Sequence, residues 1–372
     1  MKIAFVTGCL EPGRDGVGDY VRTLAAECTA RGHAVRLLSL ADTVDLSADG
    51  GTPPTRRQTL AATCDDDGRG ARAWLDEFRP DWTSLHFVPY AFHPRGLFAG
   101  RLPPLRRVLA AGARRHVFFH EIWIGFARGA PWKERAFGFL QRRALARLLH
   151  TTAPTAVHTS NGCYRRALAG LGCAASELPM FGSVPLRPGV VPAALPGVGA
   201  DALVCGMFGA VHPNWEHEPF LSDFAQLAAA RGRRAVLAAA GSLRQGEVLF
   251  PQLAAHWRGR IDCLALGLHP PAQLAEFFAR FDFAVTTSPF HLVGKSSSAA
   301  ALREHGLRVV VTNSGQPPRF AATPEDLAPA DAGFLPYFRA RESLPQALER
   351  TPPRPGASRT AEMFLAALAA HD

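Results

Sequence analysis

Short apolar segments alternate with amphipathic segments of helical period along most of the chain. In the first half this pattern predicts strands at 2–7, 34–40, 83–88, 116–120 and 155–159. Helices are predicted between them, near 18–31, 70–79, 132–150 and 161–170. Strands that alternate with helices in this way are typical of a parallel sheet covered by helices.

The alternation stops at a segment rich in proline and glycine, 184–197, and then restarts. Proline lacks a backbone donor and glycine loosens the chain, so we expect a linker over 181–200. Beyond it the pattern predicts strands at 203–208, 234–240, 261–266, 282–287 and 308–312. Helices are predicted near 216–231, 246–257, 271–281, 296–305 and 343–350, and a last one at 357–370.

These elements predict two α/β domains of ordinary size in the 372 residues. One domain is expected over 1–180 and a second over 201–350, each a doubly wound sheet, with a central cleft between them. Residues 351–372 are predicted to form a C-terminal helix that packs back on the first domain. Segments 42–57 and 314–331 lack periodicity and are predicted to be loops.

The composition narrows the class of protein. With 47% hydrophobic and 20% charged residues the chain is globular rather than disordered. No run approaches the ~20 apolar residues that span a bilayer, and a strand begins at once, so we expect no secretory signal. The seven cysteines are odd in number and include no Cys-x-x-Cys pair, which favours reduced thiols and a cytoplasmic location.

Basic residues are concentrated in one segment of the first half. Residues 101–147 carry eleven Lys and Arg and two Glu, so their charge of eleven minus two, +9, equals the net charge of the whole chain. This block predicts contact with an anion, either an anionic membrane surface or the acceptor, and the first of these predicts a peripheral protein of the inner membrane. Ordinary solvated helix faces are the alternative, and no motif indicates nucleic acid.

The helix predicted at 132–150 fits both a membrane-binding face and an ordinary solvated face. Its apolar residues are expected on one side: Phe137, Leu140, Ala144, Leu145 and Leu148. Its arginines are expected on the other: Arg135, Arg142, Arg143 and Arg147. An interfacial helix has this pattern, and so does a helix that faces a core.

Two strand-loop-helix units offer helix starts to a ligand. Gly16-Val17-Gly18 opens a helix after the first strand, and Gly294-Lys295-Ser296-Ser297-Ser298 opens one in the second half. Unpaired N–H groups and the helix dipole suit phosphate at such a start. Pro289 replaces the first glycine of a P-loop, and the first unit lacks the dinucleotide spacing, so neither an NTPase nor a nicotinamide enzyme is predicted.

Several motifs resemble family 4 glycosyltransferases of the GT-B fold. They are Lys2-Ile3-Ala4-Phe5-Val6, 16–25, Arg31-Gly32-His33-Ala34-Val35, Phe281-Asp282-Phe283-Ala284-Val285 and 305–312. The resemblance implies two Rossmann-like domains, an acceptor bound by 1–175 and a nucleotide-sugar donor bound by 200–340. It implies transfer of the sugar to a glycan, lipid-linked or small-molecule acceptor, with retention, without a metal and without a cofactor.

The chain departs from this family at four donor-side positions. Ala210 and Trp215 stand where the family has Arg and Lys, and Val293 and Ala301 stand where it has two glutamates. Lys295 and Arg244 could supply charge by another route. The departures keep two alternatives open, a non-catalytic subunit that binds a nucleotide or sugar and a sugar-nucleotide epimerase of the same fold.

The expected site residues follow from these motifs. His120 is predicted to orient or deprotonate the acceptor and Lys295 to stabilise the leaving diphosphate. The donor contacts are expected to be Gly16, Gly18, Gly209, Arg244, Gly294, Ser296 and Ser297. The acceptor contacts are expected to be His86, Glu121 and Trp123. No metal ligands are predicted, because Ile124 stands where a zinc motif beginning His120-Glu121 would place its second histidine.

Overall fold

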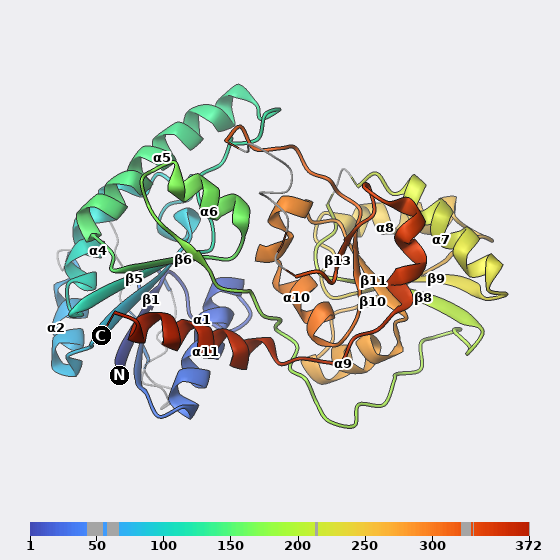
Figure 1. The fold of residues 1–372 in the computed structure, drawn as a ribbon, viewed down its shortest axis with the longest axis horizontal. Coiled ribbons are helices and arrows are strands. Elements are labelled where there is room, and N and C mark those ends of the chain that lie inside the picture. Colours follow the sequence, from blue (N-terminus) through green and yellow to red (C-terminus); the bar gives the residue numbers. More distant parts are fainter. Residues whose placement is uncertain (43–54, 58–66, 213–214, 321–328, 330, 372) are drawn as a thin grey trace. The chain divides into compact units, whose positions relative to one another are not determined.

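The computed structural model describes residues 1–42, 55–57, 67–212, 215–320, 329 and 331–371. The chain divides into two compact units, which are coloured along the sequence in Figure 1. The first unit comprises Met1–Pro179, Pro317–Asp326 and Ala357–Asp372, and the second comprises Met180–Gln316 and Leu327–Gly356. None of the described helices is long and apolar enough to cross a membrane.

The first unit is built on a parallel sheet of seven strands in the order β3-β2-β1-β4-β5-β6-β7. Its strands are β1 (Lys2–Thr7), β2 (Ala34–Ser39), β3 (Thr55–Arg57), β4 (Trp82–Phe87), β5 (Arg114–Phe119), β6 (Ala156–Thr159) and β7 (Ser176–Glu177). Its helices are α1 (Gly16–Ala30), α2 (Arg69–Phe78), α3 (Pro89–Phe92), η2 (Phe98–Arg101), α4 (Leu102–Leu109), α5 (Trp132–Thr152), α6 (Gly162–Ala169) and α11 (Gly356–Ala369). The chain order reverses between β1 and β4, which is the point where doubly wound sheets bind ligands.

The second unit repeats this plan with six parallel strands in the order β10-β9-β8-β11-β12-β13. Its strands are β8 (Ala202–Phe208), β9 (Arg234–Ala240), β10 (Asp262–Gly267), β11 (Phe283–Thr286), β12 (Val309–Val311) and β13 (Phe334–Pro336). Its helices are α7 (Glu218–Ala230), α8 (Gly246–His256), α9 (Pro271–Arg280), η3 (Phe290–Lys295), α10 (Ser297–Glu304) and η5 (Arg341–Leu348). Here the order reverses between β8 and β11.

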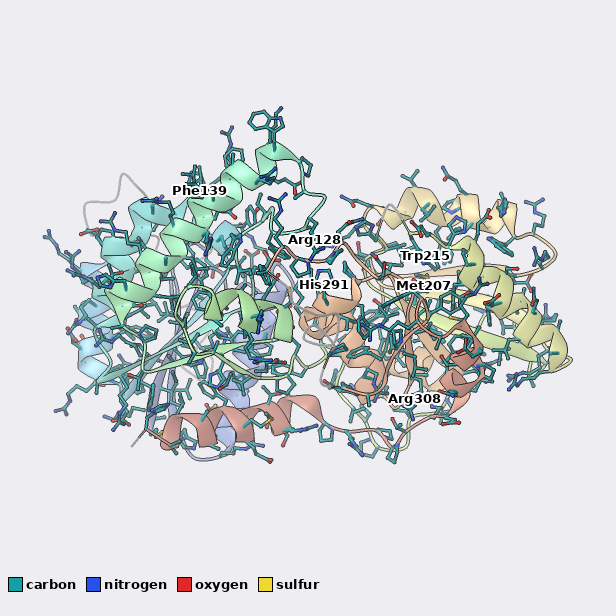
Figure 2. All side chains as sticks on the ribbon, turned by 45° about the horizontal axis from the view of Figure 1, so that its top comes forward. Arg128, Phe139, Met207, Trp215, His291 and Arg308 are labelled. Atoms are coloured by element: carbon teal, nitrogen blue, oxygen red, sulfur yellow. The ribbon has the colours of Figure 1, made fainter. Side chains whose placement is uncertain are left out.

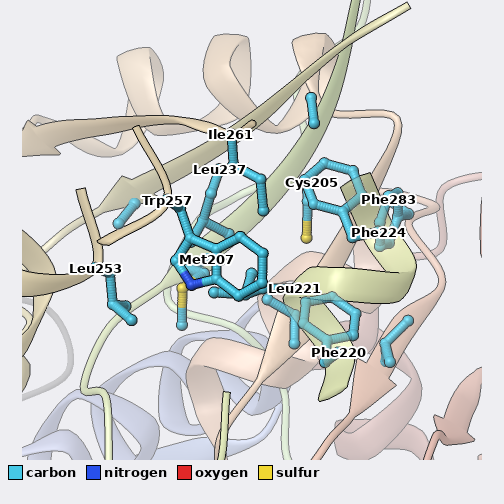
Figure 3. Packing of buried hydrophobic residues seen from close by; sticks show 14 of the residues in the cluster. Cys205, Met207, Phe220, Leu221, Phe224, Leu237, Leu253, Trp257, Ile261 and Phe283 are labelled. Atoms are coloured by element: carbon cyan, nitrogen blue, oxygen red, sulfur yellow. The ribbon is translucent and has the colours of Figure 1, made fainter. Parts of the chain in front are cut away.

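Apolar side chains fill both faces of the second sheet, which is why its strands read as continuous apolar runs. Figure 3 shows one face, where Met207 and Leu237 of the sheet lie beside Trp257 and Leu253. The other face is covered by a separate cluster that includes Phe278 of α9. Strands β8 and β9 are therefore packed from both sides, whereas the edge strand β10 is partly exposed.

The segment predicted as a linker, 181–200, belongs to the second unit. Val184 and Leu195 are buried in its core. The last helix, α11, belongs to the first unit, where Phe364 packs 5.7 Å from the Phe5 ring and 5.2 Å from the His116 ring, centroid to centroid. The Thr360 hydroxyl donates to the Pro179 carbonyl at 3.1 Å.

The structure corrects several predicted elements. The helix expected at 343–350 is the 3-10 helix η5, since Pro345 lies inside it and cannot donate a helical hydrogen bond. Strand β3 lies at the end of a segment predicted to be a loop, and the rest of 42–57 from residue 43 lies outside the described residues, as does most of 321–331. Leu140, predicted on the core face of α5, is 50% exposed.

Candidate functional site

The turn after β8 lies against the start of α10 at the carboxyl edge of the second sheet. Gly209 has a φ of 81°, and a Cβ added there would stand 2.4 Å from the Ser298 hydroxyl oxygen. Glycine allows both this left-handed backbone and this close approach. The His212 N–H donates to the Thr287 hydroxyl at 2.8 Å, which ties the same turn to the residue after β11. The turn therefore sits at the switch point of this sheet.

The start of α10 combines backbone donors, hydroxyls and a cation. Ser296 caps the helix by accepting a hydrogen bond from the Ala299 N–H at 3.2 Å. Lys295 comes directly before the cap, at the end of η3, and is half-buried together with Gly294 and Ser297. The cap occupies the Ser296 hydroxyl and leaves the other groups of the helix start to favour a phosphate.

A pocket of about 410 Å³ lies beside this edge, where β9 and β10 end below α8. Its lining is mostly apolar, with Phe250 and Leu243 among its walls and Ser242 and Glu247 as polar side chains. Gly241 connects the pocket to the turn after β8, because a Cβ on Gly241 would stand 3.5 Å from the Gly209 nitrogen. The pocket and the start of α10 thus share one edge of one sheet.

Arg244, a predicted donor contact, is exposed in the turn between β9 and α8. Its φ of 52° lies in the left-handed region, which is uncommon for a residue with a side chain. The preceding Leu243 carbonyl accepts from the Val211 N–H at 3.2 Å, so this turn adjoins the one after β8. Arg244 is therefore at the same edge as Gly209.

The four departures from the family occupy ordinary structural positions. Val293 and Ala301 are fully buried in the core. A Cβ on Gly182 would stand 2.4 Å from the Ala301 Cα. This close approach leaves no room for a longer side chain at Gly182 or at Ala301. Trp215 is buried and donates its indole N–H to the Thr312 hydroxyl at 2.8 Å, whereas Ala210 is exposed. Val293, Ala301 and Trp215 therefore supply packing rather than charge.

The start of α1 differs from that of α10. The Asp15 side chain caps it and accepts from the Val17 N–H at 3.0 Å. A carboxylate in this place disfavours a second anion. Gly18 is buried, and a Cβ on it would stand 2.5 Å from the Cys9 carbonyl oxygen, so packing alone requires glycine there. Gly16 is exposed as the first residue of the helix, and its contact with a donor stays a prediction.

The predicted acceptor residues differ in how deeply the structure buries them. His120 follows β5 and is 5% exposed, and Glu121 beside it is half-buried. Trp123 is mostly buried, with the Arg142 guanidinium 5.7 Å from its ring. His86 is 1% exposed inside β4, and its contact with the acceptor stays a prediction. Its burial follows from its strand, which is buried along its whole length.

His86 belongs to a chain of buried polar side chains, which we call the histidine chain. The His120 Nε2 lies 3.0 Å from the His86 Nδ1, and the His86 Nε2 lies 3.2 Å from the Ser84 hydroxyl oxygen. That oxygen lies 2.7 Å from the His116 Nδ1, and the His116 Nε2 lies 2.9 Å from the His158 Nδ1. Four imidazoles and one hydroxyl are therefore joined by four hydrogen bonds.

Burial keeps the histidine chain uncharged. Loss of solvent lowers the pKa of His120 to about 3 and that of His158 to about 4. It lowers the pKa values of His86 and His116 well below the ordinary range, and the neighbouring imidazoles lower them further. All four rings are thus neutral near pH 7.

The sequence analysis missed Ser84 and His116. Ser84 lies two residues before His86 on β4, and His116 lies four residues before His120, which directly follows β5. Even separations place side chains on one face of a sheet, so the polar residues at 84 and 86 and at 116 and 120 were the available signal.

Two comparisons relate the chain to known proteins. Residues 15–181 match the model of the family described as "Glycosyl transferase 4-like domain". No protein among the curated ones matches the sequence. The family match covers most of the first unit and includes α1, His120 and the histidine chain.

Solved structures share the fold over nearly the whole chain. HepE of Anabaena in complex with UDP is 14% identical, with a TM-score of 0.52 over 98% of this chain and 94% of that one. An alpha-glucosyltransferase in complex with UDP-glucose and abasic DNA is 10% identical, with a TM-score of 0.50 over 100% and 95%. A putative UDP-N-acetylglucosamine 2-epimerase from Listeria monocytogenes is 10% identical, with a TM-score of 0.53 over 100% and 96%.

At these identities the solved structures establish the fold, which is GT-B with two Rossmann-like domains. The family match assigns the first of these domains. Residues 15–181 thus match a glycosyl transferase 4-like domain, within a chain that has the GT-B fold.

Proposed function

We propose that the second unit binds a nucleotide sugar along the edge formed by the turn after β8, the start of α10 and the pocket under α8. The contact between Gly209 and Ser298 carries this proposal, because it brings the phosphate-binding helix start to the switch point of the sheet. Gly241 then leads from this point to the pocket. The diphosphate would lie at α10 and the nucleoside in the mostly apolar pocket.

The helix start also suits the chemistry of transfer. When the bond between the anomeric carbon and the phosphate oxygen breaks, the nucleoside diphosphate leaves with the bonding electrons. Lys295, the Ser297 hydroxyl and the dipole of α10 would stabilise the charge that develops on that oxygen. We propose that this cation takes the place of a metal and that Arg244 and Gly294 add to the donor site. Retention of the anomeric configuration belongs to the same proposal.

The acceptor would be bound by the first unit, at the carboxyl edge where β5 ends. His120 is 5% exposed there, with the half-buried Glu121 next in the chain. The His120 Nε2 is engaged with His86, so Nδ1 is the ring atom that would receive the acceptor's hydroxyl proton. Gly16 would lie near the transferred sugar, and Glu121 would accept hydrogen bonds from acceptor hydroxyls.

The exposed face of α5 supports a membrane-associated acceptor. Trp132, Phe139 and Leu140 are 72%, 56% and 50% exposed, and Phe139 is labelled on this helix in Figure 2. The exposed basic residues of the same helix are Lys133, Arg135, Arg142, Arg143 and Arg147. Aromatic and basic side chains together suit the interface of an anionic membrane. We propose a cytoplasmic protein that binds such a surface through 101–147 and uses a glycan or lipid-linked acceptor.

A matched pair of glycine variants tests the donor site. Gly209 and Gly259 both have a φ of 81°, but a Cβ on Gly259 has no neighbour within 4 Å. Gly209→Ala and Gly259→Ala therefore share the backbone strain, and the first also displaces Ser298. Calorimetry with UDP, GDP, CDP, dTDP and ADP should show one preferred ligand whose affinity falls about tenfold or more only in Gly209→Ala. Equal affinities in both variants would contradict the proposed site.

An epimerase is the second candidate, because the Listeria structure shares the fold. Product analysis separates the two functions. A transferase consumes the nucleotide sugar only with an acceptor, whereas an epimerase converts it without one. UDP-glucose and UDP-N-acetylglucosamine are the first donors to try.

A further inference from the structure

The histidine chain extends from the proposed acceptor site into the core of the first unit. Resting on the proposed role of His120, we propose that this chain relays the acceptor's proton from His120 through His86, Ser84 and His116 to His158. His120 is then the catalytic residue, and the other four are positioning residues that accept and pass on a proton. The argument depends on their placement, their hydrogen bonds and the proton balance.

The sheet itself sets the spacing of the histidine chain. In the register of β4 and β5, Ser84 lies opposite His116, and His86 lies opposite Phe118. Residues two apart in a strand share a face, so the five polar side chains meet on one side of the sheet. The Tyr20 ring of α1 lies 5.0 Å from the His120 ring, and Phe364 of α11 lies 5.2 Å from the His116 ring. Aromatic rings thus cover the chain of hydrogen bonds.

Every link connects ring nitrogens or a hydroxyl that can both donate and accept. A neutral imidazole has one donor and one acceptor nitrogen, and a hydroxyl can do both. In one state every Nε2 carries the proton, and each group donates toward His158. In the other state every Nδ1 carries it, and each group donates toward His120. Both states satisfy all four hydrogen bonds and leave every ring neutral.

A shift between these states balances the protons of the reaction. The acceptor oxygen gives its proton to the His120 Nδ1 as it attacks the anomeric carbon. The His120 Nε2 proton passes to the His86 Nδ1, the His86 Nε2 proton to the Ser84 oxygen, and the Ser84 proton to the His116 Nδ1. The His116 Nε2 proton passes to the His158 Nδ1, and the His158 Nε2 proton leaves to water. No imidazolium remains in the interior.

Burial makes such a relay preferable to a single base. An imidazolium at His120 would be a charge in an apolar site, which the lowered pKa of about 3 expresses. At the far end, the exposed His371 of the segment after α11 is close enough to lower the pKa of His158 further. In this proposal the proton leaves His158, which is 4% exposed, on the side of that solvent-facing group.

Kinetics with two variants and one control test the relay. Ser84→Ala breaks the middle of the histidine chain, and His116→Gln keeps hydrogen-bonding groups that cannot exchange tautomers. Thr83→Val is the matched control, since Thr83 is an equally buried hydroxyl on the opposite face of β4 that donates to the Leu109 carbonyl at 2.7 Å. We expect kcat about 10–100-fold lower in the first two variants, with the KM for the donor and the turnover of Thr83→Val nearly unchanged.

The solvent isotope effect separates a relay from a structural role. In mixtures of H₂O and D₂O, wild-type kcat plotted against the fraction of D₂O should give a curve, because several protons move together. Ser84→Ala should give a straight line. Wild-type kcat and curvature retained in both Ser84→Ala and His116→Gln would overturn the relay.

An NMR experiment keeps the relay testable if no sugar transfer is found, in which case the proposed function fails separately. The full chain labelled with ¹⁵N-histidine should show four neutral buried imidazoles at pH 7. Ser84→Ala should change the tautomer populations of all four, including His120 and His158 at the ends. Changes confined to His86 and His116, or a charged ring among the four, would show independent hydrogen bonds and overturn the relay.

Discussion

Lys295 is the residue on which the proposed diphosphate site depends most. It directly precedes the cap of α10, and loss of a charge-assisted contact costs about 1.5–3 kcal/mol. Lys295→Ala should therefore weaken nucleoside diphosphate binding roughly ten- to hundredfold in calorimetry. Lys133→Ala, which removes the same charge from the exposed start of α5, is the control. Equal affinity in the native protein and Lys295→Ala would remove Lys295 from the site.

His120 should affect transfer without affecting the donor. Removing the group that receives the acceptor's proton is expected to lower kcat roughly 10²–10⁴-fold in His120→Ala. Donor affinity should stay the same, because the proposed diphosphate site at the start of α10 lies in the other unit. His150→Ala, an exposed histidine of α5, controls for loss of an imidazole. Turnover within a few-fold of the native value, in a variant with unchanged thermal unfolding, would assign His120 a structural role.

Single site residues were predictable where one sequence pattern ends and another begins. His120 ends an apolar run, and Ser296 begins a helical pattern, so each marked the edge of an element in the sequence. The burial of His86 was not predictable, because the sequence does not tell whether a polar side chain near a strand end faces solvent or a neighbouring strand. Only the register of β4 with β5 brings Ser84 and His116 into one hydrogen-bonded chain.

Helix α5 is the element whose exposed face predicts a measurable interaction. Each basic residue near an anionic surface contributes about 1 kcal/mol, less at high salt. The native protein should sediment with anionic liposomes at low salt and should not bind neutral ones. Changing Arg142, Arg143 and Arg147 together to Glu should abolish the sedimentation with anionic liposomes.

Changing Arg231, Arg258 and Arg260 to Glu is the matched control, because these exposed residues of the second unit carry the same charge. If both triple variants lose binding equally, net charge rather than α5 is responsible. If the native protein ignores anionic liposomes even at low salt, the helix face is simply solvated.

Elements with a strong apolar period were predictable within a few residues, and others were not. Helix α4 was missed because Pro103 and Pro104 suggest a break, although proline is tolerated in the first turn of a helix. Strands β7 and β13 have two and three residues, too short for a period to appear. Such short edge strands are defined by their neighbours in the sheet.

At the scale of the whole molecule, the two units should respond oppositely to pH. In the second unit, burial raises the pKa of Glu304 to about 7, and its carboxyl accepts from the Gly182 N–H at 2.8 Å. Between about pH 4.5 and 7 the folded unit keeps a proton that the unfolded chain loses. The contribution of Glu304 is thus full below pH 4.5 and is lost as the pH rises through 7.

The histidine chain gives the stability of the first unit the opposite dependence on pH. The pKa of His158 is lowered to about 4, so the unfolded chain takes up a proton below its ordinary pKa of 6.5 while the folded unit does not. Its contribution is full above pH 6.5 and is lost as the pH falls toward 4. Each such proton changes the free energy of unfolding by about 1.4 kcal/mol per pH unit.

Urea unfolding between pH 4 and 8, followed by pulsed hydrogen exchange, can read peptides of β6 and α10 separately. We expect Glu304→Gln to reduce the pH dependence of the free energy of unfolding in the α10 peptide alone. His158→Gln should reduce it in the β6 peptide alone. A native profile with the same slope in both peptides between pH 4.5 and 6.5 would contradict these assignments.

The return of α11 to the first unit also governs when that unit can fold during synthesis. Phe364 covers Phe5 and His116, so the contact joins the beginning of the chain to its last helix. A contact of such high sequence separation cannot form until residue 369 has left the ribosome, after the entire second unit has been translated. Until then the growing chain lacks the ring that covers Phe5 and His116, and such an exposed apolar surface is prone to aggregation.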